Sequence, residues 1–385
     1  MIPYVEVIGK YSLKPFALIE PSQCWFEVSY YEAGEFEIYA PVTSSNLNAL
    51  KNGNYVKIPN MPYVWVIKNI TYTFNSEGAK VIDAKGFEAK WILHYRYVLD
   101  PINSFSTLGA TLLNLFINNV FTILDASRKI SNFNYMSQQQ QLEFAIESTQ
   151  ITREDLFVVF HNLLKTNKCG FYETYQYVNN QDSIVIRTFE GRNLTGNNIT
   201  YNQGTEYERT IQSEGLLLFS QSMDNLITAD YFESSEEKKT FCRVVSSFTE
   251  KDSNDENINV DYPYDYDQGA TGIDRIELVI NSNLNTKYVD ENGEEQETTP
   301  TSDLYQSWQK EEARNKLAEC IIKKEFKGDI DLNYCNLKFG SDFFIGDMVL
   351  VRDEFFGFQE PVRILKYTFK QDASGYGEEI EYGTE

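Results

Sequence analysis

Histidine is almost absent from this sequence, and its few cysteines follow no pattern. The 385 residues include only two histidines, His94 and His161, so a histidine-based catalytic triad or metal site has little material. The cysteines form no CxxC pair, which argues against a disulfide framework and a thiolate metal cage; they are Cys24, Cys169, Cys242, Cys320 and Cys335. The GxSxG, HExxH and phosphate-loop motifs are also missing. We therefore expect no catalytic residue, no cofactor, no metal site and no enzymatic activity.

Long apolar runs and basic residues are scarce as well. No run of 18 apolar residues occurs, which excludes a transmembrane helix. The first twenty residues lack the basic start, apolar stretch and small-residue cleavage site of a signal peptide, so we expect folding in a cytoplasm. Lys and Arg number 34 against 57 Asp and Glu, a formal net charge of −23. Such a surface repels DNA phosphates and anionic lipid, so recognition of nucleic-acid sequences and membrane binding are poor candidate functions.

One pattern occurs near both ends of the chain. The N-terminal copy is GNYVKI (53–58), IKNITYTF (67–74), a polar turn and VIDAKG (81–86); the C-terminal copy is GDMVLV (346–351), ILKYTF (364–369), a polar turn and EEIEYG (378–383). In each copy β-branched and aromatic residues alternate with polar ones around a turn, which predicts a strand followed by a long hairpin. The shared order and spacing indicate a duplicated unit, although two unrelated hairpins would give a similar pattern.

Composition and periodicity together predict an α+β fold rich in strands. The hydrophobic fraction of 42% and the 26 Tyr and 26 Phe residues favour a folded chain with much β-structure. At this length we expect two or more domains. Residues 4 to about 91 have the strand pattern, and so do segments between 171 and 189, between 214 and 250, and from 330 to the end. The Gly- and Asn-rich stretch 191–204 is expected to be a loop.

Three stretches have a helical period instead. A helix is expected within 105–121, and a second over 152–165 with Thr152 as its N-cap. A third is expected from about Asp303 to Phe326, with Ser302 as its N-cap and Gly328 as its stop.

The acidic segment 252–267 raises the question of a metal site. Its carboxylates could surround Ca²⁺, but the DxDxDG spacing and the terminal bidentate glutamate of a calcium loop are missing. We expect a solvated loop with neither helical nor strand period, and no bound metal.

Two glycines and two phenylalanines carry the structural expectations. Gly34 lies in the short connection EAG between two apolar strands, where a positive φ is often required, and Gly346 precedes a buried strand. If the two hairpins are equivalent, Phe74 and Phe369 should occupy matching positions in their cores.

The phrase SQCWFEVSYYEAGEFEIYAP resembles the opening of siphophage tail-tip hub proteins, also called tail-associated proteins. That family has an aromatic strand, a Tyr-Tyr-x-x-Gly-x-Phe turn, here Tyr30, Tyr31, Gly34 and Phe36, and an apolar strand ending at proline, here Pro41. LLLFSQSMDNLITADYFES (216–234), RVVSSF (243–248), GIDRIELVI (272–280), and FFIGDMVLV (343–351) followed by VRILKYTF (362–369) appear in the family's order. The resemblance covers essentially the whole chain.

The resemblance implies a fold similar to the baseplate hub of T-even contractile tails. It implies two tube-like β-barrel domains in pseudo-repeat, at 1–100 and at 211–254 with 329–385. It also implies an α/β accessory domain at 101–210 and a loop-and-helix insertion at 255–328. These proteins assemble as a homotrimer, which presents six similar barrels in a ring.

A functional expectation follows from that ring. A trimer of duplicated barrels would join the hexameric tail tube, or a distal tail protein ring, to a threefold spike or fibre at the virion tail tip. DNA would meet the chain only in transit through the channel, whose acidic lining would repel phosphate. Many tail-associated proteins continue into a cell-wall-digesting domain, and nothing after Glu385 would supply one here.

Two alternative functions remain open at the level of sequence. The many aromatic residues could form stacking platforms of a receptor- or glycan-binding module. Paired carboxylates of a carbohydrate-active enzyme are also compatible with so acidic a chain.

Overall fold

The computed structural model describes residues 4–74, 78–104, 106–121, 125–137, 142–178, 180–203, 206–226, 228–290, 294–329, 337–355, 357–372 and 375–383. Strands dominate, and short helices cover part of them, so the expected α+β, strand-rich class is confirmed. Cys335 lies outside the described residues.

The largest sheet contains 14 strands from both ends of the chain. The strands before residue 90 form what we call the first sheet unit: β1 (Val5–Ile8), β2 (Pro15–Ile19), β3 (Gln23–Ser29), β4 (Glu35–Pro41), β5 (Tyr55–Lys57), β6 (Trp65–Phe74) and β7 (Lys80–Glu88). The later strands form the second sheet unit: β13 (Asn193–Leu194), β16 (Leu218–Ser220), β17 (Thr228–Ser234), β23 (Lys323–Asp329), β24 (Met348–Asp353), β25 (Phe358–Asp372) and β26 (Gly375–Gly383).

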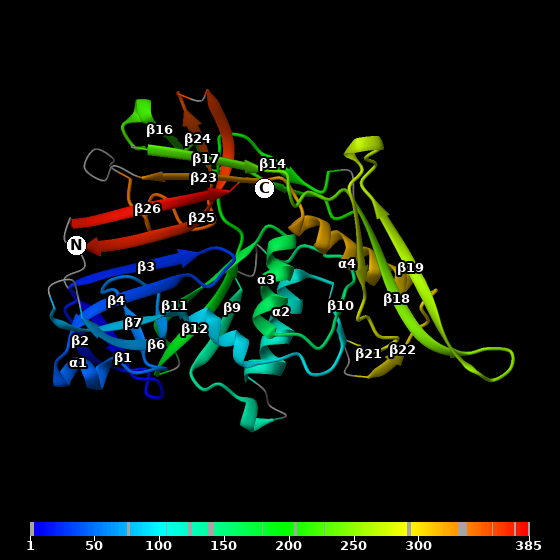
Figure 1. Ribbon diagram of the computed structural model, residues 1–385, viewed down its shortest axis with the longest axis horizontal. Helices are drawn as coiled ribbons and strands as arrows, with labels where there is room; N and C mark the ends of the chain where they lie inside the picture. Colours follow the sequence, from blue (N-terminus) through cyan, green and yellow to red (C-terminus); the bar gives the residue numbers. More distant parts are fainter. Residues whose placement is uncertain are drawn as a thin grey trace.

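The two units share one continuous sheet. Its main path runs β17-β23-β26-β25-β3-β4-β7-β6-β5-β1-β2, and β24 joins it through β25. The link between the units is the antiparallel pairing of β25 with β3, in which Phe369 lies opposite Phe26. Figure 1 shows this link as red strands beside blue ones. Among the described strands neither unit closes into a barrel, so the sheet is open.

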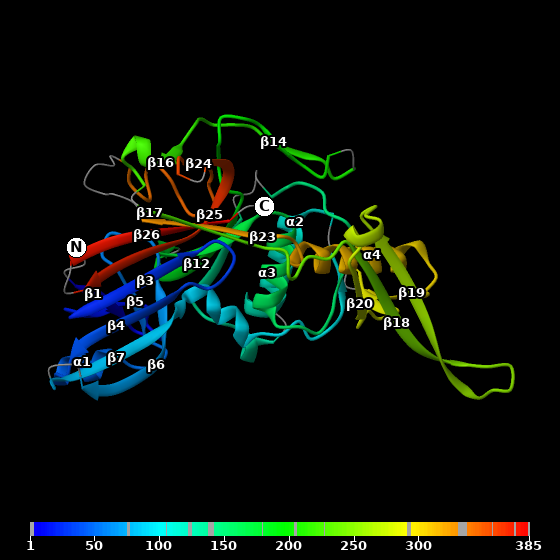
Figure 2. The same cartoon turned by 45° about the horizontal axis from the view of Figure 1, so that its top comes forward.

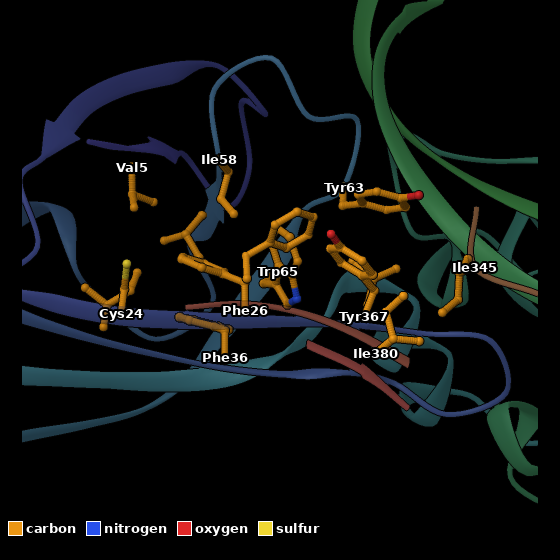
Figure 3. Packing of buried hydrophobic residues seen from close by; sticks show 14 of the residues in the cluster. Val5, Cys24, Phe26, Phe36, Ile58, Tyr63, Trp65, Ile345, Tyr367 and Ile380 are labelled. Carbon is orange, nitrogen blue, oxygen red and sulfur yellow. The ribbon is translucent and has the colours of Figure 1, made fainter. Parts of the chain in front are cut away.

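One hydrophobic core also serves both units. Phe26 and Trp65 of the first unit and Tyr367 and Ile380 of the second belong to the same cluster of buried side chains. Figure 3 shows these residues above the shared sheet. The rings of Phe26 and Trp65 lie 4.8 Å apart, centroid to centroid. Because strand side chains alternate, this core takes every second residue, and the opposite face of β3, β4 and β25 carries mainly polar side chains.

A second core lies under the α/β part of the chain. It is built by η1 (Ala89–Tyr95), α2 (Leu108–Phe116), which continues into η2 (Ile117–Phe121), α3 (Leu156–Thr166), β9 (Phe133–Ser137), β11 (Gly170–Val178) and β12 (Gln181–Phe189). The helix expected within 105–121 is confirmed. The N-cap Thr152 expected for α3 is wrong, because the Asp155 carboxylate accepts from the backbone N–H groups of Phe157 and Val158 and starts the helix there.

A long hairpin extends away from the sheet, as Figure 2 shows. It consists of β18 (Phe241–Lys251) and β19 (Asn257–Asp267), with β20 (Glu277–Asn281) beside β18. The loop expected over 252–267 is therefore wrong for most of its length. Val260, Tyr262, Tyr264 and Tyr266 alternate with polar residues, and this period of two, masked by the many acids, is the signal of a strand.

Helix α4 (Asp303–Glu319) covers part of this hairpin. The hydroxyl of Ser302 accepts from the N–H of Tyr305, so the expected N-cap is confirmed. The expected end at Gly328 is wrong, because residues 323–329 leave the helix and pair with β17 and β26 as strand β23.

The remaining elements are short. They are α1 (Ser44–Ala49), β8 (Ile102–Asn103), η3 (Ala126–Arg128), β10 (Gln150–Ile151), β14 (Ile199–Tyr201), β15 (Arg209–Ile211), η4 (Gln221–Met223), η5 (Gly272–Asp274), β21 (Lys287–Val289) and β22 (Glu295–Glu297). The strands β13 and β14 fall within the segment 191–204, which was expected to be a loop. In the described part of the chain, no helix is both long and apolar enough to cross a membrane.

Candidate functional surface

The two sequence repeats form turns with the same backbone geometry. Gly53 and Gly346 have φ values of 88° and 86°. The N–H of Gly53 donates to the Ile67 carbonyl and the N–H of Gly346 to the Ile364 carbonyl, both at 2.8 Å. In turn, the N–H groups of Ile67 and Ile364 donate to the carbonyls of Asn54 and Asp347, the residues after the two glycines, at 2.8 and 3.0 Å. Gly346 thus has the same positive φ as Gly53, and the two turns are equivalent in detail.

The hairpins that follow carry a bulge at the same place. We call β6–β7 the first hairpin and β25–β26 the second hairpin. The register shifts between Ile67 and Asn69 in one and between Ile364 and Lys366 in the other. A bulge fixes the register of everything beyond it. Counting from the bulge, Phe369 corresponds to Tyr72.

Phe74 and Phe369 accordingly occupy different environments. Phe369 is 1% exposed and Phe74 is 64% exposed. The expectation that both lie in matching core positions is wrong within the single chain. IKNITYTF has two residues more than ILKYTF, so aligning the shared YTF shifts the copies by two positions. Tyr72 is also 62% exposed, so the outer half of β6 lacks a cover in the described chain, whereas Ile82 and Ala84 of β7 are buried.

The face of the sheet away from the core carries a network of charges. Lys85 lies opposite Glu37 and forms an ion pair with it at 2.6 Å. Lys366 and Lys370 form ion pairs with Glu27 and Glu379 at 3.7 and 3.3 Å. On the described strands β3, β4, β7, β25 and β26, carboxylates outnumber ammonium groups on this face, where they are Glu27, Glu35, Glu37, Asp83, Glu379 and Glu381 against Lys85, Lys366 and Lys370. We call this surface the polar face.

Glu37 is the anchor of that network. Burial alone would raise the pKa of its carboxyl, but hydrogen bonds with Lys85, Tyr39 and Trp25 outweigh burial and lower the pKa to about 2. The indole N–H of Trp25 donates to Glu37 Oε2 at 2.9 Å. The carboxylate therefore stays charged at physiological pH.

Tyr30 lies where three parts of the chain meet. An added Cβ on Gly170 would lie 2.2 Å from the Tyr30 ring, and one on Gly346 would lie 2.3 Å from it. The Tyr30 hydroxyl accepts from the N–H of Gly191 at 3.3 Å. The buried Arg363 guanidinium lies over the ring, 5.0 Å from its centroid. One tyrosine from the YYEAG phrase thus joins the first sheet unit, the α/β part and the second sheet unit.

Gly34 is required for close packing, and its φ lies outside the left-handed region, contrary to expectation. An added Cβ would lie 2.3 Å from the Glu27 carbonyl oxygen. Its N–H donates to Glu88 Oε2 at 2.7 Å. The chain returns to β4 so close to β3 that no side chain fits.

A buried cluster of charges fastens the first sheet unit to the α/β part. Lys90 is fully buried and contacts Glu88 Oε2 at 3.0 Å and the Phe171 carbonyl at 2.8 Å. Glu173, also fully buried, accepts weakly from the N–H groups of Val64 and Lys90 at 3.5 and 3.4 Å. Burial raises the pKa of Glu173 well above its usual value, and the nearby Glu88 raises it further, whereas Lys90 lowers it.

In the described chain, the unpaired edges of the large sheet include those of β2, of β17 and of the outer half of β6. Strand β17 pairs with β23 on one side only. Residues 69–74 of β6 pair with β7 only, because β5 ends its pairing at Val66. Unpaired N–H and C=O groups along a flat edge are a template for another strand.

The histidines and the acidic segment show no catalytic grouping. His94 Nδ1 lies 3.0 Å from Asp155 Oδ2, and His161 Nε2 lies 2.9 Å from Glu32 Oε1. Within the described residues no group of three His, Cys, Asp or Glu side chains could hold a metal ion.

Three solved structures that resemble this chain in fold are tail proteins. A 43 kDa tail protein of prophage MuSo2 from Shewanella oneidensis matches with a TM-score of 0.53 at 13% identity, over 98% of each chain. A tail protein from Neisseria meningitidis MC58 matches with a TM-score of 0.52 at 9% identity, over 99% of this chain and 96% of its own. Prophage tail protein gp18 from Listeria monocytogenes EGD-e matches with a TM-score of 0.50 at 15% identity, over 99% and 94%. The fold is thus that of phage tail proteins.

The sequence itself matches a family over nearly its whole length. The profile of the Siphovirus ReqiPepy6 Gp37-like protein family matches residues 21–384. The chain belongs to that family. No curated protein sequence matches.

Proposed function

We propose that this protein is the hub of a phage tail tip. Three copies close into a ring of six sheet units around a channel, and the ring joins the hexameric tail tube or distal tail ring to a threefold spike or fibre. The observation that carries the proposal is that the eight repeated strands from β17 to β6 begin and end in unpaired edges, those of β17 and of the outer half of β6. Closed cyclic assemblies form when one surface of a chain fits a different surface of the next copy.

The repeat assigns a counterpart to each strand. Starting from the residue after each bulge, the residues that lie opposite one another on successive strands can be followed across each unit. In the first unit they are Asn69, Lys85, Glu37 and Trp25, and in the second unit they are Lys366, Glu381, Lys327 and Asp230. The seven residues of β3, 23–29, therefore correspond to 228–234, and these are the bounds of β17. By the same series β6 corresponds to β25.

This correspondence states which edges meet. Within one chain the outer half of β25 pairs with β3, with Lys366 opposite Ser29 and Phe369 opposite Phe26. Under the repeat, the outer half of β6 pairs with β17 of the next copy. The expected register places Asn69 opposite Ser234 and Tyr72 opposite Tyr231. Both edges are then used, and the eight strands from β17 to β6 of each copy continue into those of its neighbour.

The polar face then lines the channel. It lies opposite the hydrophobic core, and its carboxylates outnumber its lysines. A surface of this sign repels DNA phosphates, so DNA in transit would not adhere to it. Under this proposal the first and second sheet units are the two tube-like barrel domains, which close only in the assembly. The bounds expected from the sequence shift accordingly: β23 (323–329) joins the second barrel, and β18 (241–251) joins the accessory domains with β19 and α4 on the outside of the virion tail tip.

The oligomeric mass and a low-resolution image test the proposal. Native mass spectrometry of the purified chain, alone and with its tube partner, is expected to give a trimer, and electron microscopy is expected to give a ring with a central hole. A chain that stays monomeric at high concentration and beside its tube partner would overturn the proposal.

A further inference from the structure

A cavity of about 560 Å³ opens near Tyr30, at the meeting of the first sheet unit, the α/β part and the second sheet unit. We call it the junction pocket. Its walls come from the loop before β6, from one face of β11 and β12, and from the turn before β24. This volume lies within the range of pockets that hold small ligands or single side chains of a partner, and such pockets favour the borders between structural units.

The walls of the junction pocket are largely aromatic. Tyr63 and Phe189 are 5% and 7% exposed, and Phe344, at 37%, forms the rim. The rings of Tyr63 and Tyr172 meet edge to face at 6.0 Å, and those of Tyr172 and Phe189 at 5.0 Å. A planar or aliphatic group would therefore be packed on several sides.

Most polar groups of the pocket are already engaged. The Arg192 guanidinium binds the buried Asp347 carboxylate through Nε and Nη2, at a closest distance of 2.6 Å. Glu190 forms an ion pair with Arg209 at 2.8 Å. Few groups remain for the many hydroxyls of a sugar, each of which needs its own partner.

Arg187 differs from Arg192 in its partners. Its Nε donates to Thr174 Oγ1 at 3.2 Å and its Nη2 to Gln176 Oε1 at 3.1 Å. Both acceptors are neutral, and no described carboxylate lies within ion-pair distance of the guanidinium. A guanidinium has five N–H donors, so donors remain for a bidentate carboxylate.

We propose that the junction pocket binds an acidic peptide segment of a partner protein. A carboxylate of the segment pairs with Arg187, and a neighbouring aromatic or aliphatic side chain fills the space between Tyr63, Tyr172 and Phe344. The site is a single chain's own pocket, so the binding does not depend on ring closure.

Ligand-observed NMR with small probes tests the site. The probes are acetyl-Phe-Asp-amide, its neutral counterpart acetyl-Phe-Asn-amide, and N-acetylneuraminate as an acidic sugar. We expect the Asp peptide to bind about tenfold more tightly than the Asn peptide, the scale of one charge-assisted hydrogen bond. We expect N-acetylneuraminate not to compete.

Substitutions assign the binding to this pocket. Arg187→Gln keeps a donor toward Thr174 and should abolish the preference for Asp over Asn, whereas Phe344→Ala should weaken both peptides. The control is Arg352→Gln, since Arg352 also donates to a neutral amide, Gln359 Oε1 at 3.0 Å, but lies outside the pocket. Equal binding of the two peptides, a preference that survives Arg187→Gln, or competition by N-acetylneuraminate would overturn the proposal. Native mass spectrometry of the same samples reports ring formation separately, so failure of one proposal is distinguishable from failure of the other.

Discussion

The two hairpins share a backbone and differ in their neighbours. Each is preceded by a glycine turn, with φ values of 88° and 86°. Each of these turns is hydrogen-bonded to an isoleucine of the hairpin, and the bulge follows directly after that isoleucine. Yet the outer half of the second hairpin is covered by β3 and the ring of Phe339, which stacks on Tyr367 at 4.0 Å. Among the described residues, the outer half of β6 has no such neighbour. In the proposed ring, a second copy supplies the missing neighbour of β6.

Substitutions at the two glycine turns should give the largest difference in stability between the two hairpins. Gly346→Val forces a β-branched residue into a positive φ and also drives its Cβ into the Tyr30 ring. At Gly53 an added Cβ would meet only the flexible side chain of Lys10, at 2.8 Å. We expect Gly346→Val to destabilise the chain by about 4 kcal/mol or more and Gly53→Val by roughly 1–3 kcal/mol.

Thermal and urea unfolding of both variants would check this expectation. Gly269→Val is the control for backbone strain alone, because its φ is 84° and nothing lies within 4 Å of the added Cβ. Equal losses in all three variants would show that Tyr30 does not hold the second turn in place.

The aromatic residues of the two hairpins should respond unequally in the isolated chain. Phe369→Ala removes a ring that is 1% exposed and should cost about 3–5 kcal/mol of unfolding free energy. Phe74→Ala should cost less than about 0.5 kcal/mol, since its ring is 64% exposed. Urea unfolding measures both losses of stability, at protein concentrations too low for copies of the chain to associate. A large loss for Phe74→Ala there would mean that the first hairpin is covered within one chain.

The anchors of the two hairpins differ in their dependence on pH. The base of the second hairpin rests on Arg363, whereas the first rests on the cluster of Glu88, Lys90 and Glu173. The raised pKa of Glu173 means that its folded form prefers the neutral carboxyl. The resulting stability is fully present below the unfolded pKa of about 4.5 and is lost as pH rises through the raised pKa.

Glu173→Gln removes this titration and should reduce the loss of stability toward alkaline pH. Urea unfolding across the pH range measures the slope. Glu35→Gln, an exposed change on the polar face, is the control and should leave the slope unchanged. An unaltered slope in Glu173→Gln would show that Glu173 is ionised in the fold.

The sequence predicts the local elements better than it predicts their partners. Periodicity located the hairpins, the N-cap at Ser302 and the turn at Gly346, because these depend on a few neighbouring residues. The strand β19 could have been found, since Tyr262, Tyr264 and Tyr266 alternate with polar residues. The pairing of β25 with β3 could not, because it joins residues more than 300 positions apart in the chain. Nor does the local sequence show that residues 323–329 form strand β23. Their composition favours a helix, and only the pairing with β17 and β26 makes them a strand.

Cross-linking across the proposed seam tests the central claim most directly. In the double variant Asn69→Cys with Ser234→Cys, a short bis-maleimide should join neighbouring copies, and a denaturing gel should show dimers and trimers but nothing larger. The matched control is Asn69→Cys with Glu233→Cys, whose second cysteine points to the other face of β17. Cross-linking of both double variants is measured in the assembled state. Single-cysteine variants show how much cross-linking the native cysteines contribute. The account predicts a ladder that ends at the trimer for the first pair and is much weaker for the second. No ladder for the first pair, or an equal ladder for both, would contradict it.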